Sequence, residues 1–244
     1  MRLKAMAKIN LGLDVLGKRE DGYHEVRMIM QTIRMYDILD IRKTKRPGIV
    51  LTTNLPFIPT DSRNLVYKAA EMLMEEFDVE EGLSIKLRKF IPVAAGMAGG
   101  SSDAAAAFVG VNRMFRLGLT EEQLMERAVK VGADVPYCIM RGTALAEGIG
   151  EKLTRLPKVP KCYVLIGKPG IIRQYPVIGD IKTLMEEKGA LKAVMSGSGP
   201  TVFGIFDNRD KMAAAAKSLR RSGLAKTVFA TDIYNRDGGF TDDK

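Results

Sequence analysis

The chain is organised around the sequence Pro92-Val93-Ala94-Ala95-Gly96-Met97-Ala98-Gly99-Gly100-Ser101-Ser102-Asp103-Ala104-Ala105. Its three glycines let backbone amides approach a bulky anion, because no Cβ stands in the way. The alanine-rich run that follows predicts a helix, whose first turn has unpaired N–H groups and the positive end of the helix dipole. The two serines can cap this helix or donate to phosphate oxygens. The sequence therefore predicts a phosphate site, although a glycine turn that only caps a helix would look similar.

Common catalytic loop patterns do not fit this sequence. No lysine follows Gly100, so the ordinary P-loop pattern is absent, and so is the G-x-G-x-x-G dinucleotide fingerprint. The loop also lacks the G-x-S-x-G nucleophile elbow, which argues against a hydrolase built from Ser101, His24 and Asp134.

Length and composition restrict the remaining possibilities. The 244 residues, 46% of them hydrophobic, suffice for one large domain or two small ones. No apolar run reaches the ~18–20 residues that span a membrane, and the N-terminus is too polar for a signal sequence. Cys138 and Cys162 are far apart and His24 is the single histidine. We therefore expect a cytoplasmic protein with reduced cysteines and no metal site built from a cysteine knuckle or a histidine cluster.

The formal net charge of +9 suits either a nucleic-acid binder or an enzyme that collects phosphorylated ligands. The basic residues are spread along the chain, without an arginine-rich tail. We therefore expect small-molecule ligands, no nucleic acid or membrane partner, and a monomer or homodimer.

Hydrophobic periodicity predicts mixed strands and helices in the first half. Strands are expected at 6–15, 37–42, 48–53 and 83–90, and helices at 64–77, from 104 to 118 and from 120 toward 130. Asp61 or Ser62 is the expected cap of the first helix, and residues 120–123 fit a capping box. Asp134 is expected where a helix ends and a strand begins, because Pro136 disfavours helical backbone at Val135.

The second half predicts a regular β-α-β-β-α-β order. Strands are expected at 162–167, 191–195, 201–206 and 226–232, and helices at 177–188 and 209–221. This order is the ferredoxin-like split unit. A proline- and lysine-rich stretch at 155–160 predicts two domains, 1–156 and 157–244.

Four motifs together resemble the GHMP kinases, named for galactokinase, homoserine kinase, mevalonate kinase and phosphomevalonate kinase. They are residues 92–105, residues 7–11 with 14–25, Gly132-Ala133-Asp134-Val135-Pro136, and Met195-Ser196-Gly197-Ser198-Gly199. They occur in the family's order over nearly the whole chain. The resemblance implies an α+β protein in which an ATP-binding domain like domain 2 of ribosomal protein S5 precedes a ferredoxin-like domain.

Residues 7–25 resemble, more narrowly, the branch of the family that phosphorylates the 2-hydroxyl of cytidyl-diphosphate methylerythritol in the non-mevalonate isoprenoid pathway. The resemblance implies that Asp134 is the general base and that Lys8 lies beside it and stabilises developing charge. It implies acceptor binding by Asn10, Tyr23, His24, Gly197 and Ser198, with Tyr23 stacked on cytosine. It implies ATP binding, with Mg²⁺ near Ser101 or Ser102, by Asn64, Lys89, Pro92, Val93, Ala94, Ala95, Gly96, Met97, Ala98, Gly99, Gly100, Ser101 and Ser102.

The chain departs from the family pattern after Gly170. The family has a long segment between this point and the tyrosine-proline start of the next helix, but here Ile172 is followed almost directly by Tyr175-Pro176. The absent segment supplies a second aromatic that would sandwich cytosine against Tyr23. Either the segment is left out of the sequence as numbered, which we favour because the other motifs are intact, or it is deleted. An intact mass near 26.8 kDa would mean a deletion.

Two other functions stay open from the sequence. One is another small-molecule GHMP kinase of the homoserine or mevalonate type, against which the turn at residues 21–24 argues. The other is an RNA-binding module, which the basic charge and an S5-like fold permit but no aromatic-rich basic strand supports.

Overall fold

The structure, a computed structural model, describes residues 1–18, 20, 22, 24–170, 176–197 and 199–236. The first half of the chain forms a six-stranded sheet in the order β3-β4-β2-β5-β6, with β1 paired to β2 as well. Its strands are β1 (Arg2–Lys18), β2 (His24–Thr44), β3 (Ile49–Thr53), β4 (Gly82–Arg88), β5 (Thr143–Glu147) and β6 (Lys152–Arg155). All pairs are antiparallel except β3 with β4.

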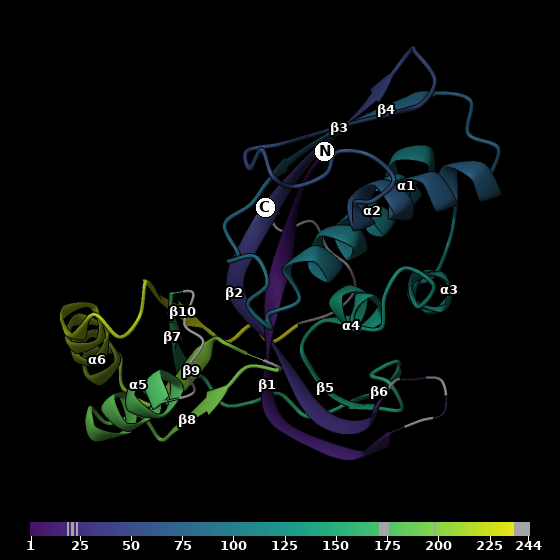
Figure 1. The fold of residues 1–244 in the computed structure, drawn as a ribbon. Helices are drawn as coiled ribbons and strands as arrows, with labels where there is room; N and C mark the ends of the chain where they lie inside the picture. The colour runs from purple at the N-terminus through teal and green to yellow at the C-terminus, as the bar shows by residue number, and fades with distance from the viewer. Residues whose placement is uncertain (19, 21, 23, 171–175, 198, 237–244) are drawn as a thin grey trace.

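Four helices accompany this sheet: α1 (Leu65–Glu76), α2 (Gly99–Phe115), α3 (Glu121–Ala128) and α4 (Val135–Met140). Three of them contact its strands, and α3 packs on α4 and α2. Figure 1 shows α1 and α2 together on one side of the long β1 and β2 strands. The inward-facing side chains of β2 and β4, such as Leu39, Ile41 and Ile85, meet the alanine-rich face of α2 in one core. The small side chains of α2 let the helix lie close to the sheet.

The β1–β2 hairpin is much longer than the predicted strands at 6–15 and 37–42. Its register shifts between Met6 and Lys8 and again between Asn10 and Gly12. Such irregularities bend a strand and free backbone groups from the ladder. At the first shift the backbone N–H of Lys8 donates to the carbonyl of Met97 at 3.2 Å. The bend therefore joins β1 to the glycine-rich segment, which comprises residues 92–98 before α2.

Two local predictions for helix ends are wrong. Asn64, not Asp61 or Ser62, caps α1, and its Oδ1 accepts from the N–H of Val66 at 2.9 Å. The chain after Asp134 is a helix rather than a strand. Pro136 lies in the first turn of α4, where a missing N–H breaks no intrahelical bond and a φ near −65° is favourable. The capping box of Thr120 and Gln123 is confirmed.

The second half forms the predicted β-α-β-β-α-β unit. Its elements are β7 (Tyr163–Lys168), α5 (Pro176–Glu187), β8 (Lys192–Met195), β9 (Val202–Phe206), α6 (Arg209–Ser222) and β10 (Thr227–Asp232). The sheet order is β10-β7-β9-β8, and α5 and α6 share a core with one face of it. The chain passes from the first sheet to the second between Arg155 and Tyr163. The proposed domain limits at 156 and 157 stay a prediction.

The other face of the small sheet packs against the first domain. Val164, Ile166 and Phe203 share a buried cluster with Ile9 of β1 and Met97 of the glycine-rich segment. Ile33 of β2 also forms a β-bridge with Ile233. The glycine-rich segment therefore lies at the junction of the two sheets.

The capping box gives a first test of this fold. Replacing Thr120 with Ala removes the acceptor for the N–H of Gln123, 3.2 Å from Thr120 Oγ1. We expect the free energy of unfolding to fall by about 1 kcal/mol, measured by urea titration. Thr120→Ser keeps the acceptor and should stay close to wild type. Equal losses in the two variants would contradict the capping role.

Candidate active site

The glycine-rich segment leaves the start of α2 uncapped. Ala94, Gly96 and Ala98 have φ values of 52°, 69° and 54°, so the backbone reverses direction repeatedly before the helix begins. Ala98 occupies the N-cap position and offers no side-chain acceptor. The N–H groups of the first turn, beginning at Gly99, are therefore available to an anionic ligand.

The two serines after the glycines differ in environment. Ser102 is buried, its hydroxyl donates to the carbonyl of Met6, and its Oγ lies 3.3 Å from Cys138 Sγ. Burial raises the pKa of Cys138 to about 12, so this thiol is neutral and does not act as a nucleophile. Ser102 thus ties α2 to β1 and α4, while Ser101 is half-buried. Of the two hydroxyls, that of Ser101 has more access to a ligand.

Lys8 lies beside Asp134, as the family resemblance implies, and Asn10 lies next to Lys8. Lys8 Nζ donates to Asn10 Oδ1 at 2.9 Å and lies 3.5 Å from Asp134 Oδ2. The side chain of Lys8 is 5% exposed, whereas that of Asp134 is 31% exposed. Asp134 is at the N-cap position of α4 and its side chain makes no capping hydrogen bond. The carboxylate is therefore held beside a buried ammonium while one side of it faces solvent.

A cavity of about 460 Å³ opens on the glycine-rich segment, within the size range of small-molecule sites. Asn64 and Lys89 line it, as the sequence predicts for ATP-binding residues, but both side chains also have structural partners. Asn64 caps α1 and donates to the carbonyl of Pro59 at 2.7 Å. The cavity is lined by Phe57, Ile58, Pro59, Arg63, Asn64, Leu65, Leu87, Lys89, Pro92, Val93, Ala94, Ala95, Gly96, Met97, Ala98, Gly99, Gly100 and Asp103.

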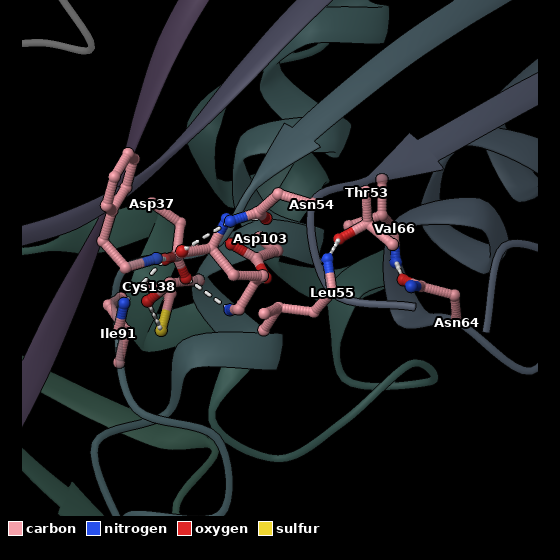
Figure 2. A network of polar contacts seen from close by, with 12 residues as sticks. Asp37, Thr53, Asn54, Leu55, Asn64, Val66, Ile91, Asp103 and Cys138 are labelled. Carbon is pink, nitrogen blue, oxygen red and sulfur yellow. Dashed lines mark hydrogen bonds and ion pairs between the residues drawn. The ribbon is translucent and has the colours of Figure 1, made fainter. Parts of the chain in front are cut away.

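The amine of Lys89 is buried in an ion cluster with Asp37 and Asp103 (Figure 2). Burial disfavours the charge on Lys89, but Asp103 and Asp37 outweigh it and the pKa of Lys89 is raised. Burial raises the pKa of Asp103 well above its usual value. Our sequence predictions omitted both acids. The signal available was a charged residue at an inward position, Asp37 between Met35 and Leu39 and Asp103 beside Ala104 and Ala107.

The second glycine turn, which contains Ser196 and Gly197, belongs to the half of the chain with the four-stranded sheet, here called the small domain, and contacts the glycine-rich segment. Ser196 Oγ donates to the carbonyl of Gly96 at 2.9 Å, and a Cβ on Gly96 would lie 2.1 Å from Ser196 O. A Cβ on Gly197 would lie 3.9 Å from Asn10 Nδ2, so this turn also approaches the Lys8 site. Lys168 Nζ donates to the carbonyl of Val93 at 2.6 Å. Side chains of the small domain therefore bind two carbonyls of the glycine-rich segment, those of Val93 and Gly96.

The predicted cytidine residues are only partly described. His24 is exposed and pairs with Lys18 at the far end of the β1–β2 hairpin, away from Lys8 in the register. Tyr23 and Ser198 lie outside the described residues.

In the part of the chain that the structure describes, no helix has both the length and the apolar character to cross a membrane. Within the same residues, no three His, Cys, Asp or Glu side chains gather in a group that could hold a metal ion.

Protein-family models match both halves of the chain. The model described as "GHMP kinases N terminal domain" matches residues 64–142, and "GHMP kinases C terminal" matches residues 148–225. Among solved structures, a crystal structure of 4-(cytidine 5'-diphospho)-2C-methyl-D-erythritol kinase is similar, with a TM-score of 0.84 and 26% identity over 97% of this chain and 100% of that one. The mevalonate kinase of L. major shares the fold at 16% identity, with a TM-score of 0.75 over 98% of this chain and 97% of its own.

Two relatives are named 4-diphosphocytidyl-2-C-methyl-D-erythritol kinase. The protein of Lachnospira eligens is 46% identical over 96% of this chain and 98% of its own length. The protein of Lachnoclostridium phytofermentans is 44% identical over 95% of this chain and 97% of its own length. The first alignment extends over 283 positions, more than the 244 residues here, so several tens of its positions have no counterpart in this chain. The place where the sequence indicates the gap, after Gly170, lies outside the described residues. By these identities and both domain matches, the chain belongs to the GHMP kinases and, within them, to the 4-diphosphocytidyl-2-C-methyl-D-erythritol kinase family.

Proposed function

We propose that this chain transfers the γ-phosphoryl group of ATP to the 2-hydroxyl of 4-diphosphocytidyl-2-C-methyl-D-erythritol, giving the 2-phosphate and ADP. The observation that carries the proposal is the Lys8–Asp134 pair, 3.5 Å apart, beside the uncapped start of α2. The names of the relatives support this acceptor.

Asp134 removes the proton from the 2-hydroxyl. A tertiary alcohol is a weak nucleophile until a base takes its proton, and the partly exposed carboxylate of Asp134 is open to a ligand on one side. The freed oxygen then bonds to the γ-phosphorus, and the bond to the β–γ bridging oxygen breaks as ADP leaves. The buried ammonium of Lys8, oriented by Asn10, stabilises the negative charge that develops between donor and acceptor.

The triphosphate lies along the glycine-rich segment, with its oxygens on the N–H groups at the start of α2. Mg²⁺ would be held mainly by the phosphates, with the half-buried hydroxyl of Ser101 as a protein oxygen at the start of α2, because Mg²⁺ usually keeps few protein ligands. When bound, it would neutralise phosphate charge. The adenosine occupies the cavity lined by Asn64 and Lys89.

The acceptor binds on the side of Asn10 and the second glycine turn. Asn10 orients the methylerythritol group, and Gly197 and Ser198 shape its surroundings. Tyr23 stacks on cytosine and His24 hydrogen-bonds to its edge. We further propose that the enzyme acts in the cytoplasm as a monomer or homodimer.

An assay of ADP release tests the acceptor. Purified protein with ATP and Mg²⁺ is offered 4-diphosphocytidyl-2-C-methyl-D-erythritol, homoserine or mevalonate in parallel. We expect turnover with the cytidyl substrate alone. Turnover that is faster with homoserine or mevalonate would reject the proposed acceptor.

Substitution of Asp134 tests the general base. Asp134→Asn keeps the size of the side chain but cannot take the proton, so kcat should fall by about 10²–10⁴-fold while ATP still binds. Lys8→Ala should likewise lower kcat more than it lowers ATP affinity. The matched control is Asp180→Asn on the exposed surface of α5, which should keep full activity. Turnover of Asp134→Asn within a few-fold of wild type would refute the role of the base.

Substitution of Gly96 tests whether its close contact with Ser196 determines the shape of the glycine-rich segment. A Cβ at this position would meet Ser196 O at 2.1 Å on a backbone with a φ of 69°. Because the segment must move to accommodate the methyl group, we expect Gly96→Ala to raise the KM for ATP by about tenfold or more. Gly179→Ala in α5, where a Cβ meets open space, is the control. An unchanged KM for ATP would show that this contact does not shape the site.

A further inference from the structure

We infer that the buried cluster of Asp37, Lys89 and Asp103 clamps the two ends of the glycine-rich segment together and thereby sets the affinity for ATP. Asp37 and Asp103 are in this sense positioning residues: they act through the backbone that binds phosphate. The inference rests on the proposed phosphoryl transfer, and its test below also works without the acceptor.

The cluster fixes the chain where it enters the segment. Asp37 Oδ1 on β2 accepts from the N–H of Ile91 at 2.8 Å and from the N–H of Phe90. The side chain of Asn54 accepts from the N–H of Lys89 at 2.8 Å and donates to its carbonyl at 3.2 Å. The three residues before Pro92 are thus bonded to two neighbouring segments.

The same cluster fixes the chain where it leaves the segment. Asp103, in the second turn of α2, accepts from Lys89 Nζ through Oδ2 at 2.6 Å, and the amine also bonds Asp37. A Cβ on Gly99 would lie 3.2 Å from Lys89 Nζ, so the first turn of α2 lies directly against the ammonium. One amine therefore joins β2, the entering strand and the helix that presents the phosphate-binding N–H groups.

Stability does not account for these buried charges. Two carboxylates share one ammonium, all three side chains are at most 5% exposed, and Asp103 Oδ1 has no hydrogen-bond partner among the described residues. A buried ion group of this kind is often no more stable than well-packed apolar side chains of similar size. Its value lies in fixing a geometry, and the geometry fixed here is that of the cavity that Lys89 and Asp103 line.

The clamp affects binding more than chemistry. Residues 92–98 connect the two fixed ends, so their backbone is ordered before ATP binds. Binding of ATP therefore costs less conformational entropy. Lys8 and Asp134 lie outside the cluster, on β1 and at the start of α4. Opening the clamp should therefore weaken ATP binding and leave the saturated turnover rate in place.

A substitution of Asp103 tests the clamp without leaving a buried charge unpaired. Asp103→Leu replaces the acceptor on α2 by leucine, a good helix former, and Lys89 keeps Asp37 as its single ionic partner. We expect the KM for ATP and the Kd for ATP measured by calorimetry without acceptor to rise about tenfold, a coupling typical of residues in one polar network. The kcat at saturating ATP and the KM for the cytidyl substrate should stay within about twofold of wild type. Asp103→Asn restores an acceptor for Lys89 and should return both ATP constants to within about twofold.

Controls separate the clamp from general loosening. Asp210→Leu makes the same replacement in the first turn of α6 and should leave the ATP constants unchanged. The inference is overturned if Asp103→Leu binds ATP as tightly as wild type, if it raises both Michaelis constants together with a lower melting temperature, or if Asp103→Asn is as impaired as Asp103→Leu. A wild type that binds ATP but does not phosphorylate the cytidyl substrate would reject the proposed function, and calorimetry would still decide on the clamp.

Discussion

The uncapped start of α2 is the constraint on which the rest of this structure depends. The first N–H groups of a helix have no acceptor within the helix, so a side-chain cap, water or a ligand must accept from them. Ala98 supplies no cap, and the neighbouring side chains bind carbonyls instead: Ser196 that of Gly96 and Lys168 that of Val93. Among the described residues, these side chains thus bind two acceptors of the segment, while no side chain caps the N–H groups at the start of α2, which are placed for an anion.

This division assigns different tasks to the two domains. The large domain supplies the helix, the Lys8–Asp134 pair and the buried cluster behind the segment. The small domain supplies the second glycine turn, which approaches both Gly96 and Asn10. A displacement of the small domain would therefore change the glycine-rich segment and the surroundings of Asn10 together. The apolar cluster that includes Ile9, Met97 and Phe203 holds these parts together.

The sequence itself predicted most where a pattern is local, as in the β-α-β-β-α-β order and the capping box at Thr120. The proximity of Lys8 to Asp134, which are far apart in the sequence, was implied by the family resemblance alone and is found in the structure. The errors arise where a tertiary contact decides between two local options, as at α4, where Pro136 suits a helix start as well as a strand. The strands β5 and β6 and the first half of β2 were not predicted. Asp37 and Asp103 were missed because they lie far from Lys89 in the sequence or on a different element. Only the packing of β2, the end of β4 and α2 brings their side chains to the amine of Lys89.

By the family resemblance, the sequence difference after Gly170 falls on the cytidine side of the site and not among the residues proposed for phosphoryl transfer. Stacking of a base on one aromatic side chain contributes about 1–3 kcal/mol, which corresponds to roughly fivefold to 150-fold in affinity. If a chain of 26.8 kDa is the whole protein, it lacks the second stacking partner that the resemblance implies, and we expect its KM for the cytidyl substrate to exceed that of the L. eligens relative by such a factor. The kcat should not fall in proportion, because the proposed mechanism assigns the reacting atoms to Lys8, Asp134 and the start of α2, whereas cytosine is at the other end of the substrate. A comparison of both constants in the two enzymes separates the loss of a binding contact from the loss of catalysis.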